Sequence, residues 1–509
     1  MNLNNNYYLS SFFWSTLSKI LSAILGFISL PLLLKYYGKA DYGILSIATA
    51  CNGYMYLLDL GMNIGSVKFF SQWKAENKID LLLKVAHTNI TFYIIIALIN
   101  SIGLIILGMW GEYLFSITHE QFLQLRYCLF ILAIFSIFSW VTTSFNQLLI
   151  ANKQISYTMQ MQCIQTVLKT LLIFIVLWYD LSLSIYFFSL TFITALLIVP
   201  YSIKCLKDNL IDNLKLGFYW KEFKIILTFS LSIFALSLFQ TTATQSRPII
   251  LSIFSSNGAS IVAEFRILEV IPMFIIMIGG TFSSIFLPKT SEMVSQHKKN
   301  EIEEFAYSWT IKTSILANIL CVPFIYSAKE VLTAYVGDEY SNLSGWLILW
   351  CITTLIQIHT TPGNSLILAY GKTNLLVLTS AISCFISIII NISLCKIYGV
   401  GSAIIGYFIY VCIVIGLYYI FYYKKIIHLN RKKMILCFLK PTIIAIIILL
   451  SIYYIPIEKI NLISSNERLN MIIISFIKTG IWFILYVVAL HIFKIIDIKL
   501  LIIKQYKGS

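Results

Sequence analysis

Long apolar runs are the feature that most constrains how this chain can fold. Each run is continuously apolar for about 20 residues, the length that crosses about 30 Å of hydrocarbon as a helix. With 59% hydrophobic and only 12% charged residues, the chain is too apolar for a soluble protein of its length. β-Barrel strands would alternate apolar and polar residues instead. The sequence therefore predicts an all-α polytopic membrane protein with about 14 transmembrane helices. The predicted spans are 11–34, 43–66, 86–109, 126–150, 157–178, 182–203, 224–252, 261–287, 308–328, 343–369, 374–396, 400–423, 434–455 and 470–493.

The basic residues gather in alternate loops, although the net charge of +15 could by itself have indicated nucleic-acid binding. Clusters follow the second, sixth and twelfth spans, whereas loops of the other parity carry mainly acids. By the positive-inside rule, both termini are predicted to be cytoplasmic. The first ten residues lack a basic cluster and no small-residue cleavage site follows, so no cleavable signal peptide is expected. We expect an inner-membrane protein and no nucleic-acid partner.

Two short stretches repeat each other, NQLLIANK from Asn146 and NSLILAYGK from Asn364. Pro31 and Pro248 recur at almost the same offset. The repeat predicts two pseudo-symmetric six-helix lobes, residues 1–222 and 223–433, with two extra helices and a tail in 434–509. Both asparagines are predicted to form structural elbows at the cytoplasmic ends of their helices, away from the substrate.

Polar residues recur at helical spacing within several predicted spans. One such stripe is usually a helix–helix contact, but several in one chain favour a shared aqueous cavity. The predicted polar lining comprises Asn52, Asn63, Gln165, Gln240 and Thr244.

Three cations in the predicted spans are candidate binding groups, because a charge at mid-bilayer costs about 2.5–3.5 kcal/mol and is rarely kept without a role. Lys169 either faces a solvated cavity or forms a buried pair with an acid, and the first interpretation is favoured. Lys19 either snorkels to the cytoplasmic head groups or lines the cavity. Arg247 precedes Pro248, where a helix kinks and exposes carbonyls, so a functional role is favoured.

The acids in the spans have separate interpretations. Asp59 and Glu264 either carry a coupling ion or proton, or pair with a cation from another helix. Arg266 and Glu269, three residues apart, are predicted to form a mutual ion pair. Lys478 is predicted to snorkel.

Motifs for catalysis or cofactor binding are missing from the sequence. The ten cysteines are scattered without a metal-binding or disulfide pattern. We find no nucleotide motif, no pairing of a nucleophile with a base and no metal cluster, so neither an enzyme nor a metal or other cofactor is expected.

Short motifs in a characteristic order resemble the polysaccharide-transport flippases of the multidrug/oligosaccharidyl-lipid/polysaccharide (MOP) superfamily, especially Wzx-type O-antigen flippases. They are Gly38-Lys-Ala-Asp-Tyr-Gly43, Leu58-Asp-Leu-Gly61, Leu287-Pro-Lys-Thr-Ser-Glu292, Val336-Gly-Asp-Glu-Tyr340, Ala369-Tyr-Gly-Lys372 and Tyr398-Gly-Val-Gly-Ser-Ala403. The resemblance implies alternating access by two lobes that move undecaprenyl-pyrophosphate-linked oligosaccharide units, for O-antigen or a related polysaccharide of lipopolysaccharide biosynthesis, to the periplasmic leaflet. It also implies membrane lipids, a polysaccharide polymerase and a chain-length regulator as partners. Lys19, Lys169 and Arg247 have the charge that a pyrophosphate requires.

Three alternatives remain open. A multidrug exporter of the same superfamily would be expected to line one lobe with acids, whereas lysines dominate the first half here. A lipid II exporter would be expected to carry more arginines in the first lobe. A membrane O-antigen polymerase needs a sizeable periplasmic loop, and the longest such loop, around 456–470, is short.

Overall fold

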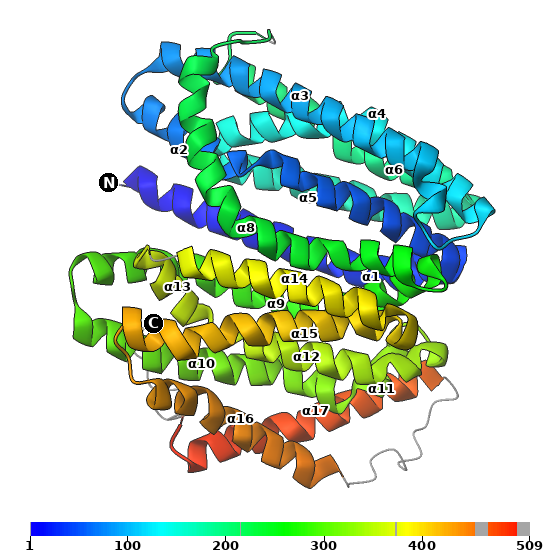
Figure 1. The fold of residues 1–509 in the computed structure, drawn as a ribbon, viewed down its shortest axis with the longest axis vertical. Helices are drawn as coiled ribbons and strands as arrows, with labels where there is room; N and C mark the ends of the chain where they lie inside the picture. The colour runs from blue at the N-terminus through cyan, green and yellow to red at the C-terminus, as the bar shows by residue number, and fades with distance from the viewer. Residues whose placement is uncertain (1, 214, 372–373, 454–466, 496–509) are drawn as a thin grey trace. The chain divides into compact units, whose positions relative to one another are not determined.

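Helices account for nearly all of the computed structural model, which describes residues 2–213, 215–371, 374–453 and 467–495 (Figure 1). The first half contains α1 (Asn2–Met55), the 3-10 turn η1 (Tyr56–Asp59), α2 (Met62–Ala75), α3 (Ile79–Trp110), η2 (Gly111–Tyr113), α4 (His119–Ala151), α5 (Ile155–Tyr179), α6 (Leu183–Ala195), α7 (Ile198–Lys207) and α8 (Trp220–Phe254). The second contains α9 (Gly258–Ser295), α10 (Lys299–Tyr326), α11 (Ala328–Tyr335), η3 (Asp338–Leu343), α12 (Ser344–Ile358), α13 (Thr361–Ala369), α14 (Asn374–Tyr398), α15 (Val400–Leu417), the π-helix η4 (Tyr418–Ile426), α16 (Arg431–Tyr453) and α17 (Glu467–Ile492).

The described part of every predicted span is helical over most of its length. In the described residues, 11 helical segments are long and apolar enough to cross a membrane. One of them, Phe13–Asp59, overlaps two predicted spans, 11–34 and 43–66, and Gly38 (φ 83°) kinks α1 between them. A positive φ costs glycine little, since it has no Cβ. α8 and α9 cover the predicted spans 224–252 and 261–287. The prediction of an all-helical, multi-pass membrane protein is confirmed.

Contacts between Cα atoms divide the chain into two compact units. Unit 1 comprises Met1–Phe265 and Cys395–Gly399, and unit 2 comprises Arg266–Leu394 and Val400–Ser509. Within unit 1, α3 packs along α4, and α1 contacts both α5 and α8. Within unit 2, α10 packs against α12 and α16, and α17 packs against α11 and α16. The lobe boundary after residue 222, taken from the internal repeat, stays a prediction.

The repeated stretches end two helices in the same way. α4 ends at Ala151 and α13 at Ala369, the same position in each copy of the repeat. Lys153 (φ 61°) and Gly371 (φ 64°) then occupy the left-handed region at matching positions. Lys372, the last residue of the second stretch, lies outside the described residues, as do residues 454–466 of the predicted periplasmic loop. The repeated sequence thus encodes a helix stop.

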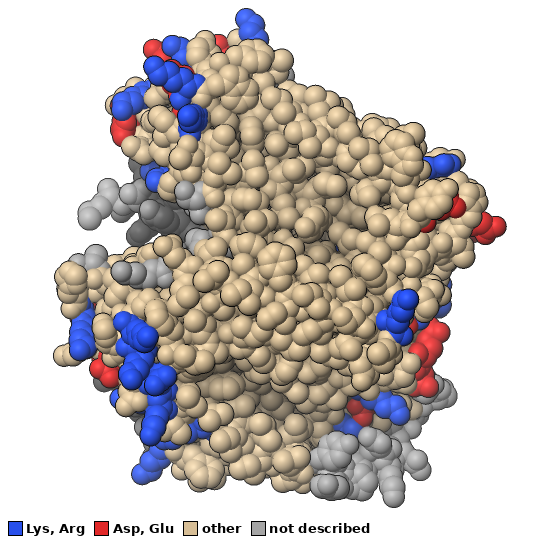
Figure 2. Space-filling model, in the orientation of Figure 1, with Lys and Arg blue, Asp and Glu red and all other residues tan. Residues whose placement is uncertain are grey.

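Charged side chains on the face drawn in Figure 2 lie at the ends of the helices, and the middle parts of the helices there are almost uncharged. Many large apolar side chains are exposed, including Phe138 at 43% and Ile134 at 65% on α4. Such exposure is expected where lipid replaces water as the solvent.

Candidate functional site in unit 1

The polar residues predicted on the second half of α1 and on α8 lie at one level of unit 1. α1 and α8 pack together, and a Cβ built at Gly53 would be 3.5 Å from Oε1 of Gln245. Asn52 precedes Gly53, so it lies at the level of Gln245. Thr244 and Arg247 are immediate neighbours of Gln245 on α8. The structure therefore places Asn52 and this part of the α8 stripe at the same level of unit 1.

Arg247 is held by a carbonyl of its own helix, α8, and by an aromatic ring of α9. Its side chain is only 4% exposed, and Nε donates a hydrogen bond to the carbonyl of Thr244 at 3.1 Å. The guanidinium lies over the ring of Phe265, 5.3 Å from the ring centroid. Thr244 donates in turn to the carbonyl of Gln240, whose side chain is exposed. Arg247 is thus oriented by a backbone carbonyl and an aromatic face.

The first half of α1 and α5 run parallel to each other. Ser11 Oγ lies 3.3 Å from Ser156 Oγ, and Ser22 Oγ lies 3.5 Å from Thr166 Oγ1. The sequence separation is almost constant, 145 and then 144 residues. A constant sequence separation between contacting residues shows that the two helices run parallel and in register.

The two predicted lysines lie on this parallel pair at different levels. Lys169 is half-buried and donates from Nζ to Oε1 of Gln165 at 3.4 Å. Gln165 donates from Nε2 to the carbonyls of Ile193 and Thr194 at 3.4 and 3.3 Å. Lys19 is exposed, and the register of the pair places it about 9 Å nearer the start of the helices than Lys169. Neither lysine forms an ion pair with a described residue.

Asp59 anchors a chain of hydrogen bonds through the interior of unit 1. The Tyr93 hydroxyl donates to Oδ1 of Asp59 at 2.6 Å, and the backbone N–H of Asn63 donates to Oδ2 at 3.1 Å. Gln147 Nε2 donates to the Tyr93 oxygen at 2.5 Å, and Asn89 Nδ2 donates to Oε1 of Gln147 at 2.9 Å. The chain links η1 to α3 and α4, and sequence reasoning did not find its members on α3 and α4. Nothing in their spacing sets them apart from ordinary interhelical polar contacts.

The Asp59 carboxylate also stabilises a break in the membrane helix. Leu60 (φ 52°) and Gly61 (φ 75°) both adopt left-handed conformations between η1 and α2. A Cβ on Gly61 would be 2.6 Å from the carbonyl oxygen of Ser230 on α8, so only glycine fits without displacement. The predicted lining residue Asn63 has an exposed side chain and binds Asp59 through its backbone. An acid beside the first N–H groups of α2 is favourable for the helix dipole.

Glu264 pairs with Lys39 across unit 1. Their charged atoms are 2.6 Å apart, and Lys39 immediately follows the kink at Gly38. The second half of α1 separates Lys39 from Asp59, which corresponds to about 30 Å of helix. The two candidate coupling acids are therefore far apart. Of the two interpretations of Glu264, pairing with a cation from another helix matches this geometry.

Two ion pairs of unit 2 bear on the remaining sequence predictions. Arg266 and Glu269 form the predicted ion pair at 2.5 Å. The prediction that Lys478 snorkels is wrong, because its side chain is 8% exposed and forms an ion pair with Glu330 of α11. The two residues are separated by 148 positions, so helical spacing gave no indication of the contact.

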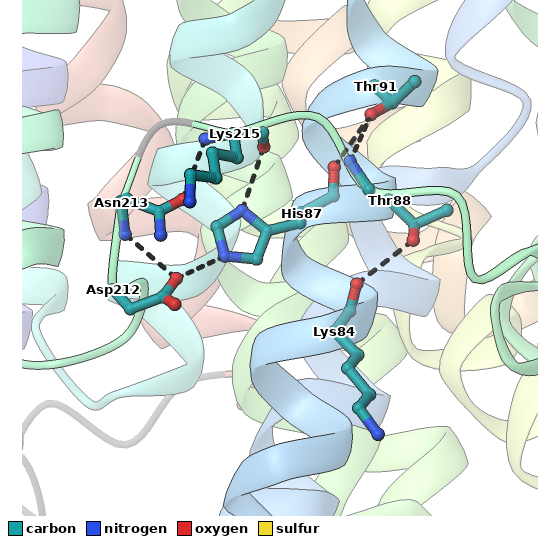
Figure 3. Close-up of polar contacts among 8 residues, drawn as sticks. Lys84, His87, Thr88, Thr91, Asp212, Asn213 and Lys215 are labelled. Atoms are coloured by element: carbon teal, nitrogen blue, oxygen red, sulfur yellow. Dashed lines mark hydrogen bonds and ion pairs between the residues drawn. The ribbon is translucent and has the colours of Figure 1, made fainter.

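The segment between α7 and α8 is bound to α3 around His87 (Figure 3). His87 Nε2 lies 2.5 Å from Oδ1 of Asp212, and Nδ1 lies 3.0 Å from the carbonyl oxygen of Lys215. The hydrogen bond from His87 lowers the pKa of Asp212 below its usual range. The backbone N–H groups of Gly217 and Tyr219 donate to threonine hydroxyls of α3 at 2.9 and 3.0 Å.

Metal chemistry has no obvious location in the described residues, where no group of three or more His, Cys, Asp or Glu side chains could hold an ion. All ten cysteines are free, and all but Cys412 are buried. Their burial matches their interpretation as small packing residues.

Comparison with solved structures gives the fold. A structure of the lipid II flippase MurJ in an inward closed conformation aligns with a TM-score of 0.68 at 16% identity, over 92% of this chain and 97% of that chain. An inward-facing multidrug resistance MATE family transporter of the MOP superfamily aligns with a TM-score of 0.61 at 13% identity, over 82% and 93%. The MATE transporter VcmN of Vibrio cholerae aligns with a TM-score of 0.53 at 13% identity, over 86% and 100%. The chain therefore shares the fold of these structures.

Sequence comparison gives the family. No match is found among curated proteins. The sequence profile of a family described as polysaccharide biosynthesis protein matches residues 8–294, which is more than half of the chain. The protein therefore belongs to the polysaccharide biosynthesis protein family, a flippase family of the MOP superfamily.

Proposed function

We propose that the protein moves an undecaprenyl-pyrophosphate-linked oligosaccharide repeat unit from the cytoplasmic to the periplasmic leaflet of the bacterial inner membrane. Membership of a polysaccharide biosynthesis family supports a glycan substrate. The MurJ structure is described as that of a lipid II flippase, which supports a lipid-linked one. A pyrophosphate with polar sugars cannot cross hydrocarbon unaided, so the protein must supply a polar route while the polyprenyl tail stays in lipid.

The observation that carries the proposal is the environment of Lys169. This lysine lies in the middle of a membrane helix, half-buried, with a neutral amide as its hydrogen-bond partner and no ion pair among the described residues. An ammonium with no acid beside it in this setting is costly unless an anion binds there. Lys19 on the neighbouring helix and Arg247 on α8 are the proposed further contacts to the pyrophosphate.

The polar residues are proposed to guide the sugars. Asn52 and Thr244 lie at the level of Arg247, while Gln165 orients Lys169. The exposed Gln240 and Asn63 are the remaining proposed lining residues. Amide and hydroxyl groups match the hydroxyl-rich surface of an oligosaccharide without adding charge.

Alternating access of two lobes is the proposed mechanism, with both termini in the cytoplasm. Asp59 is proposed as the site of ion or proton coupling, because its carboxylate lies at a helix break and at the end of a hydrogen-bond chain. Glu264 is the weaker candidate for coupling, since Lys39 already balances its charge. A polysaccharide polymerase and a chain-length regulator are the proposed protein partners.

Deletion of the gene tests the proposal. Lipid-linked repeat units should accumulate on the cytoplasmic face, and the wild-type chain should restore their transfer. The Lys169→Gln variant should fail to do so, whereas Lys169→Arg, which keeps the charge, should succeed. Lys207→Gln, at the last residue of α7, serves as the matched control. Full restoration by Lys169→Gln would contradict the proposed binding role.

The same experiment addresses the alternatives. Export of lipid II is the second candidate, favoured by the structural likeness to MurJ. In that case peptidoglycan precursors, rather than polysaccharide units, would accumulate. Drug sensitivity with normal polysaccharide would indicate a multidrug exporter, and flipped but unpolymerised units would indicate a polymerase.

A further inference from the structure

A polar cavity lies in unit 2, away from the residues discussed above. It is wide open to its surroundings, and its volume is about 440 Å³. α10 and α16 form it, and these two helices pack along each other. The lining residues are Asn300, Glu303, Glu304, Tyr307, Ser308 and Lys433.

Both signs of charge face this cavity. No described residue forms an ion pair with Glu303 or Glu304. On the other side, the Lys433 ammonium lies over the Tyr307 ring, 4.1 Å from its centroid. The Tyr307 hydroxyl accepts a hydrogen bond from the backbone N–H of Asn430 at 3.1 Å, which fixes the ring. The cavity therefore offers two carboxylates and a positioned ammonium.

The cavity lies at the level of lipid head groups. α10 and α16 are candidate membrane spans that begin at Lys299 and Arg431, and every lining residue falls within the first three turns of its helix. Membrane helices commonly keep charged residues at their ends, where head groups and water meet them. A ligand at this depth is therefore most readily supplied by the bilayer itself.

We propose that this cavity binds the head group of a zwitterionic phospholipid that carries a primary ammonium and a phosphate. Glu303 and Glu304 accept hydrogen bonds from the ammonium, and Lys433 donates to the phosphate. Such charge-assisted hydrogen bonds are stronger than neutral ones. An anionic head group would instead meet two carboxylates, and a trimethylated ammonium could not donate to them. The acyl chains then lie along the apolar surface of the two spans.

Lipid retention by the purified full-length protein tests this proposal. The chain is reconstituted into nanodiscs with an equal mixture of phosphatidylethanolamine, phosphatidylcholine and phosphatidylglycerol, transferred to mild detergent, and the retained lipids are counted by native mass spectrometry. Wild-type protein should retain phosphatidylethanolamine preferentially. The Glu303→Gln/Glu304→Gln variant should retain about tenfold less, the loss expected for one charge-assisted hydrogen bond.

Glu301→Gln is the matched control, because Glu301 lies on the same helix outside the cavity lining and pairs with Lys298 at 3.0 Å. Lys433→Gln should also reduce retention, and it provides an independent test if the double variant does not fold. Equal retention of phosphatidylglycerol by the wild-type protein would overturn the proposal. Unchanged retention of phosphatidylethanolamine in folded double-variant protein, or an equal loss in Glu301→Gln, would also overturn it.

Discussion

The ion pair between Lys478 and Glu330 leads to a sharp prediction about stability. Both side chains are 8% exposed, and the Lys478 ammonium lies 5.4 Å from the centroid of the Tyr326 ring. Removing one partner of such a pair leaves the other charge buried without compensation, which costs about 3–5 kcal/mol. Lys478→Met should therefore destabilise unit 2 by about that amount, although methionine fills a similar volume.

The double variant Lys478→Met/Glu330→Leu distinguishes the energy of the ion pair from the energies of the contacts that each side chain makes with its surroundings. It removes both charges together, so we expect it to recover most of the stability lost in Lys478→Met. Replacing a buried pair by apolar residues of similar volume is often neutral or favourable. A double-mutant cycle should then give a coupling energy that accounts for most of the loss caused by the single substitution.

Denaturant-induced unfolding in mild detergent measures these differences. It is followed by the part of the tryptophan fluorescence that is lost in Trp482→Phe, because the chain has ten tryptophans. Trp482 is fully buried, and Nε1 donates to the carbonyl of Ala445 on α16 at 3.3 Å, so its emission reports detachment of α17. Lys312→Met on α10 is the control, because that lysine forms no ion pair with a described residue. Wild-type stability of Lys478→Met, or a double variant less stable than the single variant, would refute the argument.

Three further predictions test unit 1. Lys169→Gln should reduce transfer of lipid-linked glycan at least about tenfold, as expected for a lost charge-assisted contact, and restored transfer at higher substrate would identify a binding defect. The hydrogen bond to His87 lowers the pKa of Asp212 in the folded state. The stabilisation it provides is therefore complete above the carboxyl's unfolded pKa of about 4, and it is lost as the pH falls through the lower folded pKa. Hydrogen exchange should show loss of protection around Asp212 in acid, and Asp212→Asn should lack this pH dependence. Gly43→Val should abolish folding or transport, since a Cβ there would be 1.9 Å from the carbonyl oxygen of Ala259, and normal levels of active protein would contradict this.

The transmembrane helices could be read directly from the sequence, because crossing a bilayer needs a continuous apolar run of a certain length. The ion pair between Arg266 and Glu269 was equally accessible, since residues three apart share one face of a helix. The ends of α4 and α13 followed from the repeated sequence. These features depend on residues that are close together in the sequence, so they can be predicted from it.

The contacts that give the candidate residues their chemistry needed the tertiary structure. Lys39 and Glu264 are 225 residues apart, and Lys478 and Glu330 are 148 apart. Asp59 receives a hydrogen bond from Tyr93 of α3, 34 residues along the chain, which no local pattern could show. Helical periodicity indicates which face of a helix is polar, but it does not indicate which other helix meets that face. A polytopic helical fold with cations in its spans could thus be predicted from the sequence. Which of the charges are balanced depends on how the helices pack, because an ion pair requires two residues to be close in space and not along the chain.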